Sequence, residues 1–149
     1  MPTKTAIILP TDFSDLSLAA LPWAKRMSAM RNAEIHCVYT VEEPHIYGSL
    51  GMDMATVPMP TAQELADSAQ IQLDVLVNEH LQGLEPAPVT KVLIGKPAEK
   101  IVEYADSVSA EVIIMTTHGY SGMKHVLLGS TTEGVLRHAN CPVLSIRIP

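Results

Sequence analysis

The chain has 149 residues and a formal net charge of −6, from 10 Lys and Arg against 16 Asp and Glu. Hydrophobic residues make up 47% and charged residues 17%, which excludes a disordered chain and predicts a single domain over residues 1–149 with its own core. The acidic balance and the scattered Lys and Arg residues argue against binding to nucleic acid or to anionic lipid.

Apolar runs rich in β-branched residues alternate with segments of helical periodicity. The apolar runs predict five strands, at Thr5–Pro10, Ala33–Val41, Val89–Ile94, Glu111–Thr116 and Pro142–Ile148. The periodic segments between them predict four helices, at Ser14–Met30, Thr61–Leu84, Pro97–Ser107 and Thr131–Ala139. Pro22 is expected to kink the first helix or to disturb its first turns. This order, with strands that are continuously apolar, predicts an α/β fold with a parallel sheet and helices on both faces.

No segment predicts a signal peptide or a membrane span. The apolar run Ala6–Leu9 is too short for either, so we expect a cytoplasmic protein without membrane insertion. Cys37 and Cys141 lack metal-ligand spacing and are expected to be buried, reduced thiols.

Two long connections, Glu42–Pro60 and Thr117–Ser130, follow the carboxyl ends of predicted strands. In parallel α/β sheets ligands bind beyond these ends, so we expect the site there. Met52, Met54 and Met59 of the first connection either cover a ligand or partner, or form a lid without chemistry.

In the second connection, Gly129 and Ser130 lead directly into a helix. A helix N-terminus offers N–H groups and a positive dipole end, which suit a phosphate. The alternative needs no ligand, because Ser130 with Glu133 three residues later also predicts a capping box.

The end of the first strand offers a second candidate. Asp12 can accept hydrogen bonds from ribose hydroxyls or hold a hydrated Mg²⁺. The alternative is that Asp12 or Ser14 only caps the first helix.

Four sequence features now carry a family resemblance. The chain resembles the universal stress protein family at Thr11-Asp12-Phe13-Ser14, Thr117-His118-Gly119, Gly129-Ser130 and the tail Leu136–Leu144. The resemblance spans the chain in element order. The resemblance implies a five-stranded sheet of order 3-2-1-4-5, with the glycine loop beside the end of strand one.

The ATP-binding branch of that family carries G-x2-G-x9-G-[S/T]. Gly119, Gly129 and Ser130 fit this pattern, whereas Thr116 stands at the first glycine, where its hydroxyl either supplies a hydrogen bond or crowds the pocket. Tyr120 and His125 stand where related sequences often carry Arg. The resemblance implies ATP, with Mg²⁺, as the ligand, and site residues Pro10, Thr11, Asp12, Val41, Thr116, His118, Gly119, Gly122, Gly129, Ser130 and Thr131.

In this arrangement Asp12 would contact the ribose, Val41 would line the adenine pocket through its backbone, and Thr131 would donate to a phosphate. The resemblance also implies a homodimer through Val143–Ile148, a predicted edge strand, and a regulatory protein partner. His118 and His125 make a poor metal site, because no carboxylate or thiol accompanies them.

We find no clear general base, so any hydrolysis or autophosphorylation is expected to be slow, with Ser130 and Thr131 as the nearest hydroxyls. The expected function is a nucleotide-dependent regulatory switch. Two alternatives stay open: a nucleotide-free interaction protein that acts through its dimer surfaces, and an enzyme with slow ATPase or adenylylating activity.

Overall fold

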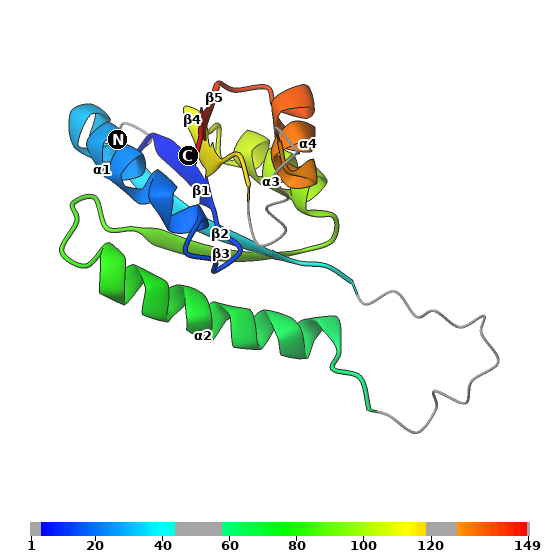
Figure 1. Cartoon of the computed structure of the whole chain (residues 1–149). Coiled ribbons are helices and arrows are strands. Elements are labelled where there is room, and N and C mark those ends of the chain that lie inside the picture. The colour runs from blue at the N-terminus through cyan, green and yellow to red at the C-terminus, as the bar shows by residue number, and fades with distance from the viewer. Residues whose placement is uncertain (1–3, 44–57, 119–127, 149) are drawn as a thin grey trace.

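A computed structural model describes residues 4–43, 58–118 and 128–148 of the chain. Strands and helices alternate, and the helices lie on both sides of one central sheet (Figure 1). In chain order the elements are β1 Ala6–Pro10, η1 Ser17–Ala20 (a 3-10 helix), α1 Leu21–Arg31, β2 Glu34–Val41, α2 Ala62–His80, β3 Val89–Ile94, α3 Pro97–Ser107, β4 Val112–Thr116, α4 Ser130–His138 and β5 Val143–Ile146.

The sheet is parallel throughout and has the order β3-β2-β1-β4-β5. The predicted fold class and strand order are therefore confirmed. β1 is the middle strand, and Ile8 lies opposite His36 of β2 and Ile113 of β4. The strand order reverses between β1 and β4, which is where an open parallel sheet leaves a crevice at its carboxyl edge.

Two apolar layers hold the helices to the sheet. Ile7 and Leu9 of β1 pack on one face with residues of α1 and α2, whereas Ala6 and Ile8 pack on the other face with residues of α3 and α4. This division follows from strand geometry, because successive side chains point to opposite faces. β1 and β4 are buried along their whole length, which explains their continuously apolar sequences.

The first helix differs from the prediction. The sequence pattern predicts a helix from Ser14, but the α-helix begins at Leu21 with Pro22 in its first turn, after the 3-10 turn Ser17–Ala20. Proline has no N–H to donate and is accommodated where a helix starts. Pro22 thus disturbs the first turns, as expected.

Helix α2 begins with a capping box: Thr61 Oγ1 accepts from the Glu64 N–H at 3.1 Å, and Glu64 Oε2 accepts from the Thr61 N–H at 3.0 Å. It ends at His80, before the predicted Leu84. Gly83, with a φ of +80°, lies in the turn that follows. Within the described residues, no helix has both the length and the apolar character of a membrane span.

Candidate functional site

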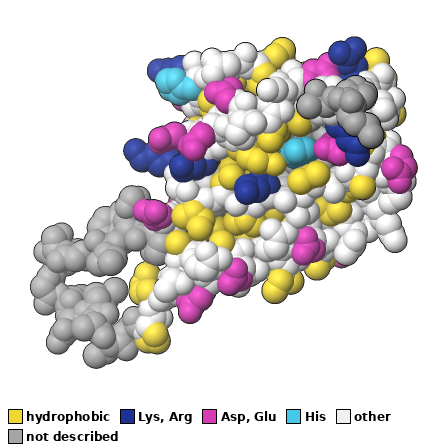
Figure 2. All heavy atoms as spheres, turned by 180° about the vertical axis from the view of Figure 1, so that it is seen from behind, with side chains coloured by type: hydrophobic (Ala, Val, Ile, Leu, Met, Phe, Trp, Pro, Cys, Tyr) yellow, Lys and Arg dark blue, Asp and Glu magenta, His cyan; other side chains and the backbone are white. Residues whose placement is uncertain are grey.

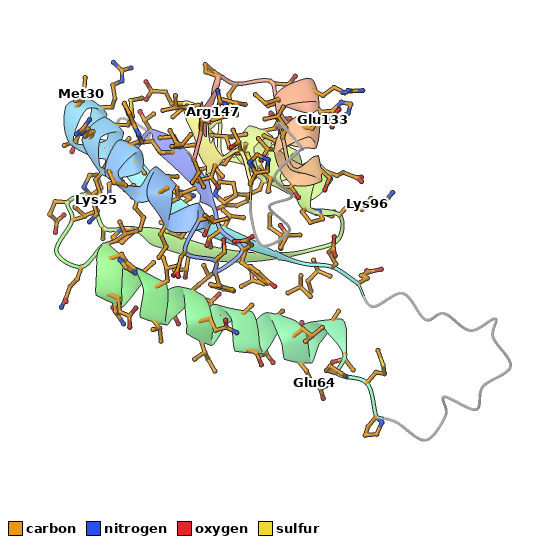
Figure 3. The ribbon with its side chains drawn as sticks, in the orientation of Figure 1. Lys25, Met30, Glu64, Lys96, Glu133 and Arg147 are labelled. Carbon is orange, nitrogen blue, oxygen red and sulfur yellow. The ribbon has the colours of Figure 1, made fainter. Side chains whose placement is uncertain are left out.

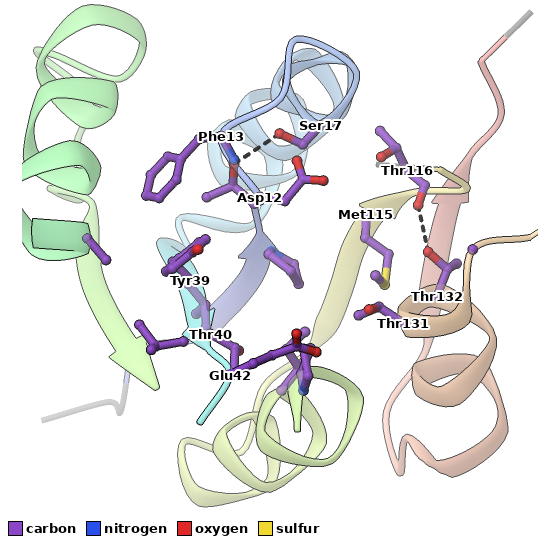
Figure 4. A pocket seen from close by; sticks show the side chains of 18 of the residues that line it. Asp12, Phe13, Ser17, Tyr39, Thr40, Glu42, Met115, Thr116, Thr131 and Thr132 are labelled. Carbon is purple, nitrogen blue, oxygen red and sulfur yellow. Dashed lines mark hydrogen bonds between the residues drawn. The ribbon is translucent and has the colours of Figure 1, made fainter. Parts of the chain in front are cut away.

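A cavity of about 650 Å³ opens at the carboxyl edge of the sheet, where β1, β2 and β4 end. Its size falls within the range of small-molecule sites, about 300–1,000 Å³. Figure 4 shows its arrangement: Phe13 and Tyr39 lie on the α2 side, Thr116, Thr131 and Thr132 lie on the α4 side, and Asp12 lies between them. One end is thus aromatic and the other is rich in hydroxyl groups.

The segment after β1 is fixed by its own side chains. Asp12 Oδ1 accepts hydrogen bonds from the N–H of Ser14, at 3.0 Å, and from the Ser14 hydroxyl. Thr11 Oγ1 accepts from the Phe13 N–H at 3.0 Å and bonds the Ser17 hydroxyl at 3.0 Å. Phe13 takes a φ of +65° and stacks on Tyr39 with 4.5 Å between ring centroids. Asp12 therefore shapes a turn at the cavity wall and does not cap α1.

The segment after β4 is held in a similar way. The Thr116 hydroxyl donates to the His118 carbonyl at 2.9 Å, and the Thr132 hydroxyl donates to the Thr116 carbonyl at 2.8 Å. The Gly129 N–H donates to the Thr117 carbonyl at 2.7 Å. These bonds anchor the N-terminus of α4 against the end of β4, so the helix end faces the cavity.

The predicted capping box at Ser130 is wrong. The N-cap of α4 is Gly129, Ser130 is the first residue of the helix, and no described side chain caps this N-terminus. The Glu133 N–H donates to the Gly129 carbonyl within the helix. The sequence pattern misleads because the helix begins one residue earlier than predicted. The first turn of α4 thus lines the cavity, and no described side chain accepts from its N–H groups.

Nine of the eleven predicted site residues line this one cavity: Pro10, Thr11, Asp12, Val41, Thr116, His118, Gly129, Ser130 and Thr131. Gly119 and Gly122 lie outside the described residues, as do Tyr120, His125, Met52 and Met54. Met59 is described and exposed. The Val41 carbonyl already accepts from the Gly95 N–H at 2.9 Å.

The sequence prediction misses several lining residues. From α2, the cavity is lined by Leu65, Ser68, Ala69 and Gln72. Tyr39 and Thr40 of β2 also line it, as does Glu42 just after that strand. The spacing of the α2 residues by three and four along the chain is a helical stripe. The sequence shows this stripe, but it does not identify a cavity wall, because Leu65 and Ala69 also pack in the hydrophobic core.

The charges on the cavity wall are negative. Asp12 and Glu42 are the carboxylates among the described lining residues, which include no Lys or Arg. Within the described residues, no group of three or more His, Cys, Asp or Glu residues is arranged to hold a metal ion. Among the described residues, the groups that could bind an anion are the hydroxyl groups, the N–H groups and the α4 dipole.

The two cysteines lie away from the cavity and are free. Burial raises the pKa of the Cys37 thiol to about 12. Burial also raises the pKa of Cys141, which is half-buried where full burial was expected. Both thiols are therefore protonated at neutral pH and poorly nucleophilic. His36 is buried, and its Nδ1 bonds the Tyr104 hydroxyl at 2.9 Å.

A sequence model of the universal stress protein family matches residues 5–147. The chain belongs to this family. Universal stress protein MJ0531 of Methanocaldococcus jannaschii is 32% identical over 143 residues, which cover 96% of this chain and 82% of that protein. The solved structure of MJ0577, a universal stress protein of the same organism, has a TM-score of 0.78 at 26% identity and covers 99% of this chain and 98% of that one.

Two further universal stress proteins of this fold were solved with nucleotides. One is in complex with cAMP; its TM-score is 0.65 at 23% identity, covering 97% of each chain. The other, from Archaeoglobus fulgidus, is in complex with dAMP; its TM-score is 0.63 at 19% identity, covering 98% of this chain and 99% of that one. At these identities the likeness establishes a shared fold.

Proposed function

We propose that this universal stress protein binds an adenine nucleotide, ATP with Mg²⁺, in the cavity at the carboxyl edge of the sheet. The observation that carries the proposal is that nine predicted residues, from three segments far apart in sequence, line one cavity. The cAMP and dAMP complexes of two proteins with this fold support an adenine nucleotide as the ligand class.

The two ends of the cavity suggest an orientation for the nucleotide. The adenine ring would lie at the aromatic end, between Tyr39 and Val41 on one side and Leu65 of α2 on the other. Asp12 would accept from the ribose hydroxyls at the middle of the cavity. The phosphates would reach the N-terminus of α4, which no described side chain caps, and the Thr131 hydroxyl.

A regulatory role suits this site better than efficient catalysis. The Asp12 carboxylate accepts two hydrogen bonds from Ser14, which fix its position at the cavity wall. Asp12 would therefore position the ribose or Mg²⁺. Bound nucleotide would change the surface that a regulatory protein partner meets.

We also propose a homodimer through β5. The Pro142 and Ile146 carbonyls point toward β4, because they accept from the N–H groups of Ile113 and Thr117. Backbone groups alternate in direction along a strand, so those of Val143, Ser145 and Arg147 point outward. β5 is an edge of the sheet, and this row of outward groups can pair with the same strand of a second copy.

The proposal is tested first on the untagged protein. We expect denaturation to release ATP or ADP at about one molecule per chain, identified by chromatography and mass spectrometry, or the emptied protein to bind ATP·Mg²⁺ in calorimetry. An empty protein that also ignores added ATP·Mg²⁺ would contradict the proposal and favour a nucleotide-free interaction protein.

Gly129 provides a variant that separates binding from folding. A Cβ at this position would meet the Thr117 carbonyl oxygen at 3.4 Å, which is an ordinary contact. Gly129→Ala should therefore fold and serve as the matched control. Gly129→Leu should place a larger side chain in the path of the phosphates and raise the Kd for ATP at least tenfold. Unchanged ATP affinity in a folded Gly129→Leu protein would exclude the α4 end as the phosphate site.

A further inference from the structure

The two helices on one face of the sheet carry opposite charges. α1 contains Lys25, Arg26 and Arg31 and no Asp or Glu. α2 contains Glu64, Asp67, Asp74 and Glu79 and no Lys or Arg. The contrast is local, because other described surfaces mix the two signs, as in the ion pairs Lys100–Glu103 and Arg137–Glu133.

The outer face of α1 joins basic residues to exposed apolar side chains. Met30 is 79% exposed and Trp23 is 44% exposed, and the Arg26 guanidinium lies 5.3 Å from the Trp23 ring centroid. Arg31 is paired with Glu111, but neither Lys25 nor Arg26 forms an ion pair with a described residue. Figure 3 labels Met30 at the outer end of α1, away from the sheet.

The outer face of α2 joins acidic residues to exposed apolar side chains. Ile71 is 67% exposed and Val75, one helical turn later, is 49% exposed. Asp67 and Asp74 lie on the same face and accept from neutral glutamine amides, and neither forms an ion pair with a described residue. In Figure 2, acidic and hydrophobic side chains alternate along the lower edge of the molecule, where α2 lies.

Both outer faces point to the same side of the molecule. Leu21 and Ala24 of α1 belong to the same core cluster as Leu73 and Leu76 of α2, so the two helices cover one face of the sheet. A two-fold rotation about an axis between them can bring α1 of each copy onto α2 of the other. Such a contact is closed, and every interaction in it occurs twice.

We propose that the α1 and α2 outer faces bind each other between two copies of this chain. The apolar pair Trp23 and Met30 meets Ile71 and Val75, while Arg26, on the same face of α1 as Trp23 and Met30, meets Asp67 and Asp74. A second copy offers an acidic face to α1 and a basic face to α2 at the same time, whereas an acidic or a basic partner would complement only one of the two faces. This helix-face contact uses a different surface from the β5 edge, so its failure would leave the proposed β5 homodimer and nucleotide site untouched.

The test measures self-association by sedimentation velocity over a range of protein concentrations, in the wild type and in a chain whose β5 edge carries Ser145→Pro. We expect the Ser145→Pro chain still to dimerise, and its dimer to weaken as salt is raised, because exposed charges are screened beyond about 10 Å at 0.1 M salt. A Ser145→Pro chain that stays monomeric at every concentration would overturn the proposal.

Charge reversal identifies the surface. In the Ser145→Pro chain, Arg26→Glu should raise the Kd of self-association at least about tenfold, since like charges across an interface repel. Lys96→Glu is the matched control, because Lys96 is also exposed and lies at the opposite side of the molecule (Figure 3). Adding Asp74→Arg to Arg26→Glu should restore association. Equal effects of Arg26→Glu and Lys96→Glu, or no recovery in the double variant, would overturn the helix-face contact.

Discussion

At the scale of single residues, the negative charges around the cavity oppose the binding of a phosphate ligand. Asp12 and Glu42 are both part of its wall, and the described lining residues include no Lys or Arg. A triphosphate would bring about four negative charges next to these carboxylates, where the repulsion is large unless a cation intervenes. The N–H groups of α4 and the threonine hydroxyls supply dipoles, which balance only part of this charge.

We therefore expect ATP binding to depend strongly on Mg²⁺. Calorimetry with ATP should give a Kd at least tenfold higher in excess EDTA than in Mg²⁺, because the metal ion would neutralise phosphate charge and Asp12 would help to hold it. Adenosine is the matched control, since it carries no phosphate and its affinity should be the same in both buffers. Equal ATP affinity with and without Mg²⁺ would indicate another source of positive charge at the site.

Thr116 illustrates what the sequence leaves open at this scale. The family pattern has glycine there, and the sequence alone allows a hydroxyl that helps or a side chain that crowds. In the structure Thr116 is buried and its hydroxyl donates to the His118 carbonyl. The side chain is thus engaged with its own turn, a contact that depends on the path of the backbone after β4 and cannot be obtained from residue spacing.

At the scale of elements, the position of α4 depends on one close contact with α3. A Cβ built on Gly134 would lie 2.6 Å from the Cβ of Ala98, closer than non-bonded carbon atoms approach each other. Glycine here has no unusual backbone angle to satisfy, so its role is to let the two helices pack closely. Because Ser130 and Thr131 at the start of α4 line the cavity, this contact also positions the phosphate end of the site.

Gly134→Ala should destabilise the protein by about 1–3 kcal/mol, the usual cost of overpacking a well-packed interface. Urea unfolding followed by circular dichroism measures this difference. The same substitution in an Ala98→Gly background should be neutral or stabilising, because the space is then free and alanine favours a helix over glycine by about 1 kcal/mol. Destabilisation that persists unchanged in the Ala98→Gly background would show that the α3–α4 contact is not its cause.

The elements also show which parts of the fold were predictable. The strands follow from composition because β1 and β4 are buried on both faces and admit only apolar side chains. The start of α1 could not be predicted in the same way, because the Thr11 and Ser17 hydroxyls bond each other and the Ser14 hydroxyl accepts from the Ser17 N–H, which holds the chain in a turn. Such local polar bonds compete with a helix and have no periodic signature.

The candidate site was predictable to a similar degree. Parallel strands bring their carboxyl ends to one edge, which predicts where a site lies. The family resemblance supplies the eleven predicted residues, and nine of them line one cavity. The cavity residues of α2 could not be predicted from the sequence, because a residue such as Ala69 faces both the core and the cavity. The apolar stripe along α2 is the same for either role. Only the packing angle of α2 on the sheet decides between them.

At the scale of the whole molecule, the proposals use three different surfaces: the cavity at the carboxyl edge, the β5 edge and the outer faces of α1 and α2. β3 forms the other edge of the sheet, and α2 packs against it, whereas β5 has few contacts with α4. The β5 edge is thus the less protected of the two, and pairing with a second copy would cover its outward backbone groups.

Ser145→Pro tests this pairing with little disturbance inside the chain. Ser145 lies between Leu144 and Ile146, and its backbone N–H points away from β4, so proline removes a donor that only a second copy would use. We expect the wild type to sediment as a dimer or larger at low micromolar concentration and Ser145→Pro to lose the β5 contribution, with a Kd at least tenfold higher. Ser145→Ala keeps the N–H and should associate like the wild type. If Ser145→Pro remains folded by circular dichroism and associates as tightly as Ser145→Ala, β5 is not the dimer interface, and the association must use another surface.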